Sequence, residues 1–122
     1  MKYLCLAYEE ERRLTELTKD QWLALRQETL NYVEDLKRRR KLLLTNALQS
    51  ARKAHSLQIR DGKLSVTDGP FAETKEQIGG FFLIDAASEE EALKIAAGWP
   101  SARLGTIEVR PVEEELRLEG RY

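Results

Sequence analysis

The sequence predicts an α+β domain of ferredoxin-like topology, in which two helices cover one face of a mainly antiparallel sheet. Three observations support this prediction. Strand-like and helix-like segments follow the order strand, long helix, several strands, short helix, strand. Both helices begin at capping signals, and an Asp-Gly pair marks a tight hairpin between the middle strands. The 122 residues are enough for one domain, which we expect to span residues 1–122.

The amino-terminal part predicts a strand followed by the long helix. From Lys2 to Tyr8, apolar side chains occupy both alternating faces, as in a strand inside a sheet. After a polar connector, Thr18 is the expected N-cap, with Gln21 as its capping-box partner. The helix should run to about Arg40. Its inward stripe is expected to contain Trp22, Leu25, Thr29, Tyr32, Val33 and Leu36.

A two-residue hairpin turn is expected at Asp61-Gly62, because this pair favours the type I′ turn. Pairing then proceeds outward from the turn and places His55 opposite Asp68. Because the side-chain period of a strand is two residues, this polar pair should share a face with the apolar residues. Those apolar residues alternate with polar ones and are predicted to be half-buried: Leu57, Ile59, Leu64 and Val66.

The carboxy-terminal part predicts a strand, a short helix and a final strand. The segment "IGGFFLIDA" is one apolar strand, and "GTIEVRP" alternates until Pro111, which ends the other. Between them, the box Ser88–Glu91 should cap a helix that ends near Gly98. The charged tail "EEELRLEGRY" is expected to fray or to add a peripheral turn. The inward residues of the short helix are expected to be Ala92, Leu93, Ala96 and Ala97.

Helices on one side of a sheet leave its other face to be covered. Tyr, Phe and Leu side chains occur on both faces of the predicted strands. We therefore expect a second subunit to cover the free face, which makes the protein a homodimer.

Composition and charge narrow the class of protein. Lys and Arg number 20 against 21 for Asp and Glu, so a net charge of −1 provides no global attraction to nucleic acid or anionic membranes. No segment approaches the ~20 apolar residues of a spanning helix, and the first apolar run is too short for a signal peptide. The single Cys5 cannot form an internal disulfide, which fits a reducing, cytoplasmic compartment.

Several other kinds of site are not expected. The basic run "KRRRK" at 37–41 suits a helix C-terminus, although such a run also attracts phosphate. Without interleaved aromatic residues, we do not expect it to bind nucleic acid. One His and one Cys without ligand spacing argue against a metal site. Neither a phosphate-binding glycine loop nor a nucleophile elbow occurs, and no cofactor is expected.

His55 and Asp68 form the first candidate site. A His–carboxylate pair can perform general acid–base chemistry near neutral pH. A polar pair beside apolar side chains also needs mutual hydrogen bonding or a ligand. The functional interpretation therefore stands beside a structural one, in which the pair only closes the end of the hairpin.

The stretch "TDGPFAETKEQIGGFF" at 67–82 provides further candidates. Asp68-Gly69-Pro70 predicts a turn, in which the Asp side chain accepts from nearby backbone NH groups. Phe71 is expected to be buried, and Gly79-Gly80 to let another segment approach the backbone closely. The charged residues of this stretch form either a solvated loop or the wall of a cleft: Glu73, Lys75 and Glu76.

The longer segment "DGPFAETKEQIGGFFLIDA" resembles the signature of the YCII-related proteins, in the branch called DGPF-domain proteins. "MKYLCLAY", "NALQS" and "ARLGTIEVRPV" extend the resemblance over most of the chain. The resemblance implies the dimeric α+β barrel fold, in which two ferredoxin-like subunits pack their sheets face to face.

The same resemblance implies a site and a partner. It implies small-molecule enzymology at a His–Asp pair, with Asp68 as the acidic residue of the motif. His55 lies in "AHSLQ", where relatives often read Ala-Thr-Thr-Val-Arg, and Asn46 stands where some relatives carry His. Genes of this branch near those of extracytoplasmic-function sigma factors imply a link to transcription regulation.

The leading expectation is a small-molecule-binding protein or enzyme with a pocket between sheet and helices or at the dimer interface. Asp68 and His55 would handle protons on a small polar ligand, and Lys75 would balance an anionic group. Further substrate contacts are expected from Glu73, Phe71 and Asn46. The alternative is a non-catalytic ligand-binding or regulatory protein associated with sigma-factor-dependent transcription.

Overall fold

The computed structural model describes residues 1–115, so residues 116–122 of the charged tail lie outside the described part. Two short 3₁₀ helices also occur, at Ala51–Lys53 and Pro100–Arg103. The strands and α-helices are, in chain order, β1 (Lys2–Glu9), α1 (Glu11–Thr15), α2 (Lys19–Arg38), β2 (Leu42–Ala47), β3 (His55–Arg60), β4 (Lys63–Asp68), β5 (Gln77–Asp85), α3 (Glu89–Ala97) and β6 (Thr106–Pro111).

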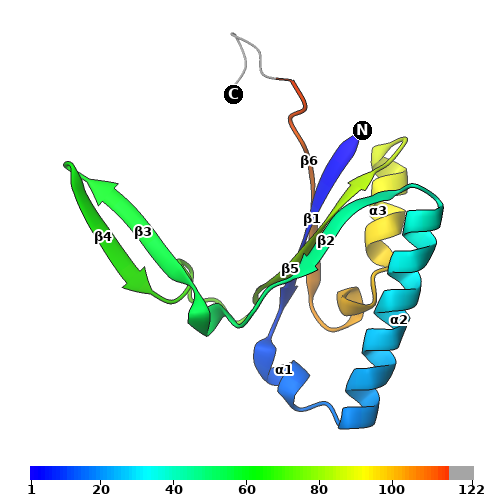
Figure 1. Ribbon diagram of the computed structural model, residues 1–122, viewed down its shortest axis with the longest axis horizontal. Helices are drawn as coiled ribbons and strands as arrows, with labels where there is room; N and C mark the ends of the chain where they lie inside the picture. Colours follow the sequence, from blue (N-terminus) through cyan, green and yellow to red (C-terminus); the bar gives the residue numbers. More distant parts are fainter. Residues whose placement is uncertain (116–122) are drawn as a thin grey trace.

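The main sheet confirms the predicted fold class. Its four strands lie in the order β2-β5-β1-β6, and all neighbouring strands are antiparallel. Without the β3–β4 hairpin, the chain follows the ferredoxin-like order β1, α2, β2, β5, α3, β6. The helices α2 and α3 lie side by side on one face of this sheet (Figure 1).

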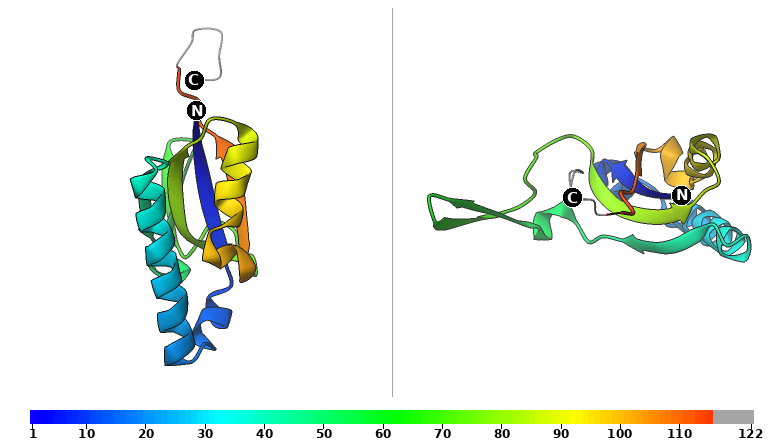
Figure 2. Two further views of the ribbon diagram at one scale, coloured as in Figure 1. Left: turned by 90° about the vertical axis from the view of Figure 1, so that its right-hand side faces the viewer. Right: turned by 90° about the horizontal axis from the view of Figure 1, so that it is seen from above.

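The core lies between the sheet and these two helices (Figure 2). Alternate residues of the central strands point into it, with Cys5 on β1 and Phe82 on β5 almost completely buried. Trp99 follows α3 and stacks on Phe82 with a centroid separation of 3.9 Å. Burial raises the pKa of the Cys5 thiol to about 12, so this cysteine is a packing residue rather than a reactive one.

The long helix begins as predicted and ends slightly early. The Thr18 hydroxyl accepts from the Gln21 backbone N–H at 3.1 Å, and the Gln21 side chain accepts from the Thr18 N–H at 2.9 Å. This capping box is the predicted one. The helix ends at Arg38, whereas the prediction extended it to about Arg40.

Only part of the predicted α2 stripe is buried. Val33 and Leu36 belong to the core, but Trp22 is 45% exposed. The reason is geometric, since the amino-terminal half of α2 extends beyond the end of the sheet (Figure 1). The expected polar connector before it contains the short helix α1.

The short helix α3 begins at Ser88, whose hydroxyl accepts from the Glu91 N–H at 3.2 Å. The predicted inward positions Leu93 and Ala97 are wrong, because both are exposed. The buried face instead runs through Ala92, Ile95 and Ala96, at the i, i+3, i+4 spacing of one helical stripe.

The basic run after α2 is largely paired with carboxylates. Arg38 and Arg39 contact Asp35 at 3.5 and 3.2 Å, and Lys41 contacts Glu91 at 2.7 Å. These residues close the end of α2 and join it to α3, which agrees with the helix-terminus interpretation of the run.

The β3–β4 hairpin, which we call the arm (residues 55–68), forms a separate two-stranded sheet. Its turn has positive φ at both Asp61 (51°) and Gly62 (74°), as the type I′ prediction requires. The arm projects away from the helices and from the main sheet (Figures 1 and 2). The prediction of half-buried apolar residues is therefore wrong for this chain alone: Leu57, Ile59, Leu64 and Val66 are 55–66% exposed.

The face of the main sheet opposite the helices, which we call the bare face, is also apolar. It presents the residues that alternate with the buried ones, so that Leu4 lies beside Leu83 and Leu6 beside Phe81. Leu44 on the edge strand β2 pairs with Leu83 and is 51% exposed. These five residues define the bare face, and no helix of the described chain covers them (Figure 1).

Candidate functional site

The predicted register of the arm is confirmed, and it brings His55 and Asp68 together. The two residues are cross-strand partners at the base of the arm. His55 Nδ1 lies 3.0 Å from Asp68 Oδ1, within hydrogen-bonding distance. The two side chains are 67% and 90% exposed, so the pair lies beside exposed apolar residues rather than in the core.

Backbone geometry fixes the base of the arm next to this pair. The Gly69 N–H donates to the Ala54 carbonyl at 2.7 Å, and the Ser56 hydroxyl donates to the Gly69 carbonyl at 2.9 Å. Gly69 has φ +102°, in the region that glycine adopts most easily. The start of the DGPF turn therefore extends the pairing by one residue, before the first residue of β3 and after the last residue of β4.

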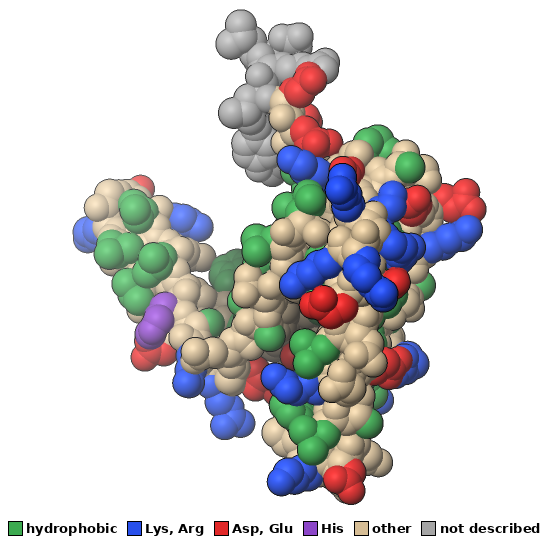
Figure 3. All heavy atoms as spheres, turned by 45° about the vertical axis from the view of Figure 1, so that its right-hand side comes forward, with side chains coloured by type: hydrophobic (Ala, Val, Ile, Leu, Met, Phe, Trp, Pro, Cys, Tyr) green, Lys and Arg blue, Asp and Glu red, His purple; other side chains and the backbone are tan. Residues whose placement is uncertain are grey.

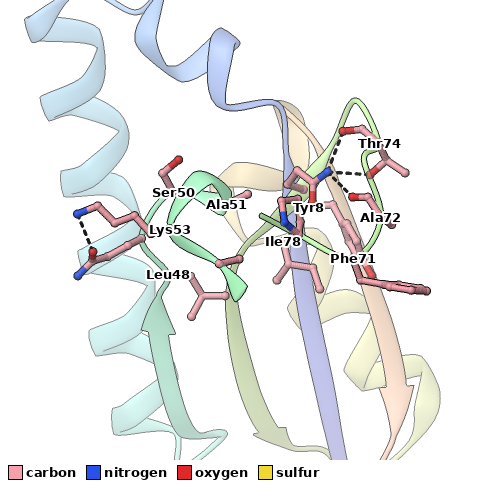
Figure 4. Close-up of a pocket in the computed structure, with 13 residues that line it drawn as sticks. Tyr8, Leu48, Ser50, Ala51, Lys53, Phe71, Ala72, Thr74 and Ile78 are labelled. Atoms are coloured by element: carbon pink, nitrogen blue, oxygen red, sulfur yellow. Dashed lines mark hydrogen bonds between the residues drawn. The ribbon is translucent and has the colours of Figure 1, made fainter. Parts of the chain in front are cut away.

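An open cleft of about 640 Å³ lies between the base of the arm and the main sheet. One wall is the connection from β2 to β3, residues 48–54. The other is residues 70–78, which are the loop before β5 and the first two residues of β5, together with Tyr8. Figure 4 shows the two walls facing each other, with Leu48 and Ala51 on one side and Phe71 and Ile78 on the other. Its lining is mainly apolar, and a few polar side chains border it, as in most small-molecule sites.

Gln77 holds the loop wall in place. Its side-chain amide donates to the Ala72 carbonyl at 2.7 Å and to the Thr74 carbonyl at 3.0 Å (Figure 4). A single side chain thus closes the loop that carries Phe71. This role of Gln77 is not predictable from the sequence, because it depends on how the loop folds.

Glu11 holds the other wall. Its carboxylate accepts from the Ala51 N–H at 2.7 Å and from the Ser50 hydroxyl at 2.9 Å. These bonds favour the charged form, and they lower the pKa of Glu11 below its ordinary value. This contact is not predictable from the sequence, which indicates only a polar connector before the long helix.

Lys53 is a cationic side chain on the cleft lining that the sequence analysis also missed. Its ammonium group donates to the Gln49 side chain at 3.0 Å (Figure 4). Lys53 is exposed, and its ammonium group points away from the wall that carries Phe71 and Ile78 (Figure 4).

The glycine pair at the start of β5 permits two close approaches, as predicted. Gly79 is an extra residue opposite β1, where the register shifts between Ala7 and Tyr8. A Cβ at Gly79 would overlap the Glu9 carboxyl group, and one at Gly80 would lie 3.1 Å from the Asn46 carbonyl. Burial, with a smaller contribution from the nearby Glu11 charge, raises the pKa of Glu9.

The remaining predicted site residues do not gather at the His55–Asp68 pair. Phe71 lines the cleft, but the expectation that it is buried is wrong, since it is 81% exposed. Lys75 lies 3.9 Å from Glu10 beside a second, polar hollow. Asn46 lies on β2 opposite Phe81, and it does not line the cleft. Glu73 is exposed on the loop and does not line it either.

Two other kinds of feature do not occur within residues 1–115. No cluster of three or more His, Cys, Asp or Glu side chains in this range is arranged to hold a metal ion. Among the helices of the same range, none combines the length and apolar character that crossing a membrane requires.

Comparison with known proteins identifies the family. Residues 1–116 match the model of the YCII-related domain, which is nearly the whole chain. An uncharacterized protein of Rhizobium meliloti (strain 1021) is 51% identical over 61 residues, which are 48% of this chain and 49% of that protein. The chain thus aligns with about half the length of this relative. On the family match, this chain belongs to the YCII-related proteins.

Proposed function

We propose that this YCII-related protein, of the DGPF branch, is a cytoplasmic homodimer that binds a small ligand in the cleft and uses Asp68 with His55 for proton transfer. One observation carries the proposal. Both cleft walls lead directly into the paired residues, since Ala54 lines the cleft next to His55 and Pro70 lines it two residues after Asp68.

The pair has the chemistry that proton transfer needs. Imidazole is the side chain most often used as a general acid or base near neutral pH. If Nδ1 carries the proton donated to Asp68, Nε2 remains as the acceptor for a ligand proton. The carboxylate orients the ring and stabilises the imidazolium that forms, as in other His–carboxylate pairs.

The cleft lining indicates the kind of ligand. Ile78 and Phe71 provide apolar surface, and Lys75 on the loop provides positive charge. A small organic acid with an apolar part matches this combination. Lys75 is the lysine that the sequence predicts to balance the anion.

A thermal-shift screen with small aromatic and aliphatic carboxylic acids tests the proposal, because a ligand of the folded state raises the melting temperature. Asp68→Asn should fold normally and alter the affinity or pH dependence of the best compound between pH 5 and 8. His55→Thr should be milder, since Thr also forms a hydrogen bond across the strands. Asp20→Asn, on the exposed start of α2, is the matched control and should bind as wild type does.

The proposed role of Asp68 fails if Asp68→Asn binds the compound indistinguishably from wild type throughout this pH range. If no carboxylic acid of the panel raises the melting temperature, the proposed ligand class is wrong.

A second candidate function rests on the exposed apolar residues of the arm. Such a surface also suits a non-catalytic regulatory protein, and the DGPF branch supports a link to sigma-factor-dependent transcription. Turnover of a cleft ligand that is lost in Asp68→Asn would favour the enzyme over this alternative.

A further inference from the structure

A second hollow lies next to the cleft and contains charged side chains of both signs. This polar hollow has a volume of about 640 Å³ and is open to solvent. Its lining includes two carboxylates and two cationic groups: Glu10, Glu76, Arg13 and Lys75. Because these four charges sum to zero, the hollow as a whole attracts neither a simple anion nor a simple cation strongly.

Arg13 provides a cation that no carboxylate of the described chain neutralises. On the face of the molecule that Figure 3 shows, many Lys and Arg side chains lie beside Asp or Glu side chains. Arg103 and Glu28, for example, are joined by hydrogen bonds of 2.8 and 2.7 Å. Arg13 instead donates one bond, at 3.0 Å, to the Leu104 carbonyl, and it forms no ion pair within residues 1–115. The remaining N–H groups of its planar guanidinium can bind both oxygens of a carboxylate.

Glu76 provides the opposite charge, also without an ionic partner. Its side chain is partly buried, and Oε2 accepts from the Thr106 hydroxyl at 3.1 Å. Lys75, which precedes it, lies 3.9 Å from Glu10, and no Lys or Arg of residues 1–115 forms an ion pair with Glu76. A partly buried carboxylate gains most from a partner that supplies a positive charge and hydrogen bonds. The hollow therefore suits a ligand that carries an ammonium group as well as a carboxylate.

Tyr8 connects the polar hollow to the cleft. Both Tyr8 and Thr74 line the two spaces. On β1, Tyr8 is the cross-strand partner of Ile78 on one side and of Thr106 on the other. Ile78 belongs to the lining of the cleft, and Thr106 belongs to that of the hollow. A small molecule lying across Tyr8 can therefore place its charged end in the hollow and its apolar end in the cleft.

We propose that the two spaces together bind an α-amino acid with an apolar side chain. Arg13 binds its carboxylate, Glu76 binds its ammonium group, and the apolar side chain lies across Tyr8 toward Ile78. This inference rests on the proposed function, because it narrows the ligand of the same cleft from small organic acids in general to zwitterionic ones. A zwitterion neutralises both unpaired charges at once, which a simple carboxylic acid does not.

Calorimetric titration with matched pairs of compounds tests the ligand class. L-Phenylalanine is compared with 3-phenylpropanoate, and L-leucine with 4-methylpentanoate, so that the two members of a pair differ only in the ammonium group. At least one amino acid should bind about tenfold or more tightly than its partner, because it gains charge-assisted hydrogen bonds at Glu76. Glycine should bind more weakly than both amino acids, because it has no side chain to occupy the cleft.

Two substitutions test the place of binding. Glu76→Gln keeps the shape of the side chain and removes its charge, so it should weaken the amino acid about tenfold or more and leave the partner acid unchanged. Arg13→Gln should weaken both compounds of a pair. Arg12→Gln and Glu16→Gln are the matched controls, because this exposed ion pair of the same helical segment lines neither space, and both should bind as wild type does.

The comparison of compounds needs no variant, so it remains decisive if a substitution perturbs folding. If the partner acids bind as tightly as the amino acids, the amino-acid ligand is wrong, while the carboxylic-acid ligand of the cleft stands. Amino-acid binding that Glu76→Gln leaves unchanged would overturn the polar hollow as its place. If no compound binds, both this inference and the proposed ligand class are wrong. The expected discrimination together with unaltered binding to Asp68→Asn would support the hollow and reject the proposed role of Asp68.

Discussion

Glu9 shows how a single residue responds to the packing around it. It ends β1, and its carboxyl group lies over Gly79, where any side chain would displace it. Partial burial disfavours the charged carboxylate, and the Glu11 charge adds to this, so the pKa of Glu9 is raised. The folded protein therefore binds the Glu9 proton more tightly than the unfolded chain does.

This shift predicts a pH-dependent difference between wild type and Glu9→Gln. The stabilising contribution of Glu9 is fully present below its unfolded pKa and is lost as the pH rises through the higher folded pKa. We therefore compare the free energy of unfolding of Glu9→Gln with that of wild type, both measured by urea unfolding. The difference should favour the variant more at pH 7 than at pH 4. Glu113→Gln, at an exposed position, is the control. A constant difference across the pH range would contradict the assigned burial of Glu9.

Residues whose roles depend on local pairing were predictable, and residues that act between distant segments were not. His55 and Asp68 were found because the Asp61-Gly62 turn sets the register of both strands. Glu11 contacts residues 50 and 51, which lie 39 and 40 positions away in sequence. No periodicity or motif indicates such a contact, because it depends on how the cleft walls come together.

At the scale of elements, the arm shows which features of a hairpin can be predicted from the alternation of its strands and which cannot. Alternation in β3 and β4 identified the apolar face and the register. It did not indicate what covers that face, and the prediction of half-buried side chains is wrong for the single chain. The predicted stripe of α2 is only partly buried for a similar reason. Helical spacing identifies which residues share a stripe, but it does not indicate how far the sheet extends beneath the helix.

The turn of the arm provides a prediction for this element. Gly62 has φ +74° and nothing within 4 Å of an added Cβ, so a substitution there is strained by its backbone conformation alone. Gly62→Val should destabilise the arm by roughly 1 kcal/mol or more, because a β-branched residue resists positive φ. In dilute samples, we expect faster exchange of the β3 and β4 amides and an unchanged unfolding midpoint of the main sheet with its helices.

Gly62→Asn is the matched variant, because Asn tolerates this conformation better than Val does. It should preserve most of the arm's protection. Equal protection of the arm in wild type and Gly62→Val would contradict the type I′ turn as the determinant of this hairpin.

At the scale of the whole molecule, the protein consists of the arm and a ferredoxin-like body, by which we mean the main sheet with α2 and α3. The body buries its core between sheet and helices, so the order of elements was enough to predict it. The cleft lies where body and arm meet, and its walls come from residues 48–54 and 70–78, with Tyr8 from β1. Its position was not predictable, because the arm's direction follows from the two connections rather than from any strand pattern.

The cleft is the proposed ligand site, with His55 and Asp68 at its border. The most direct test is a titration of isotope-labelled protein, followed by amide NMR shifts, with the carboxylic acid that raises the melting temperature most. If the ligand binds in the cleft, the largest shifts should fall in residues 48–56 and 68–78. Shifts confined to α2 and α3, with none in these two segments, would contradict it.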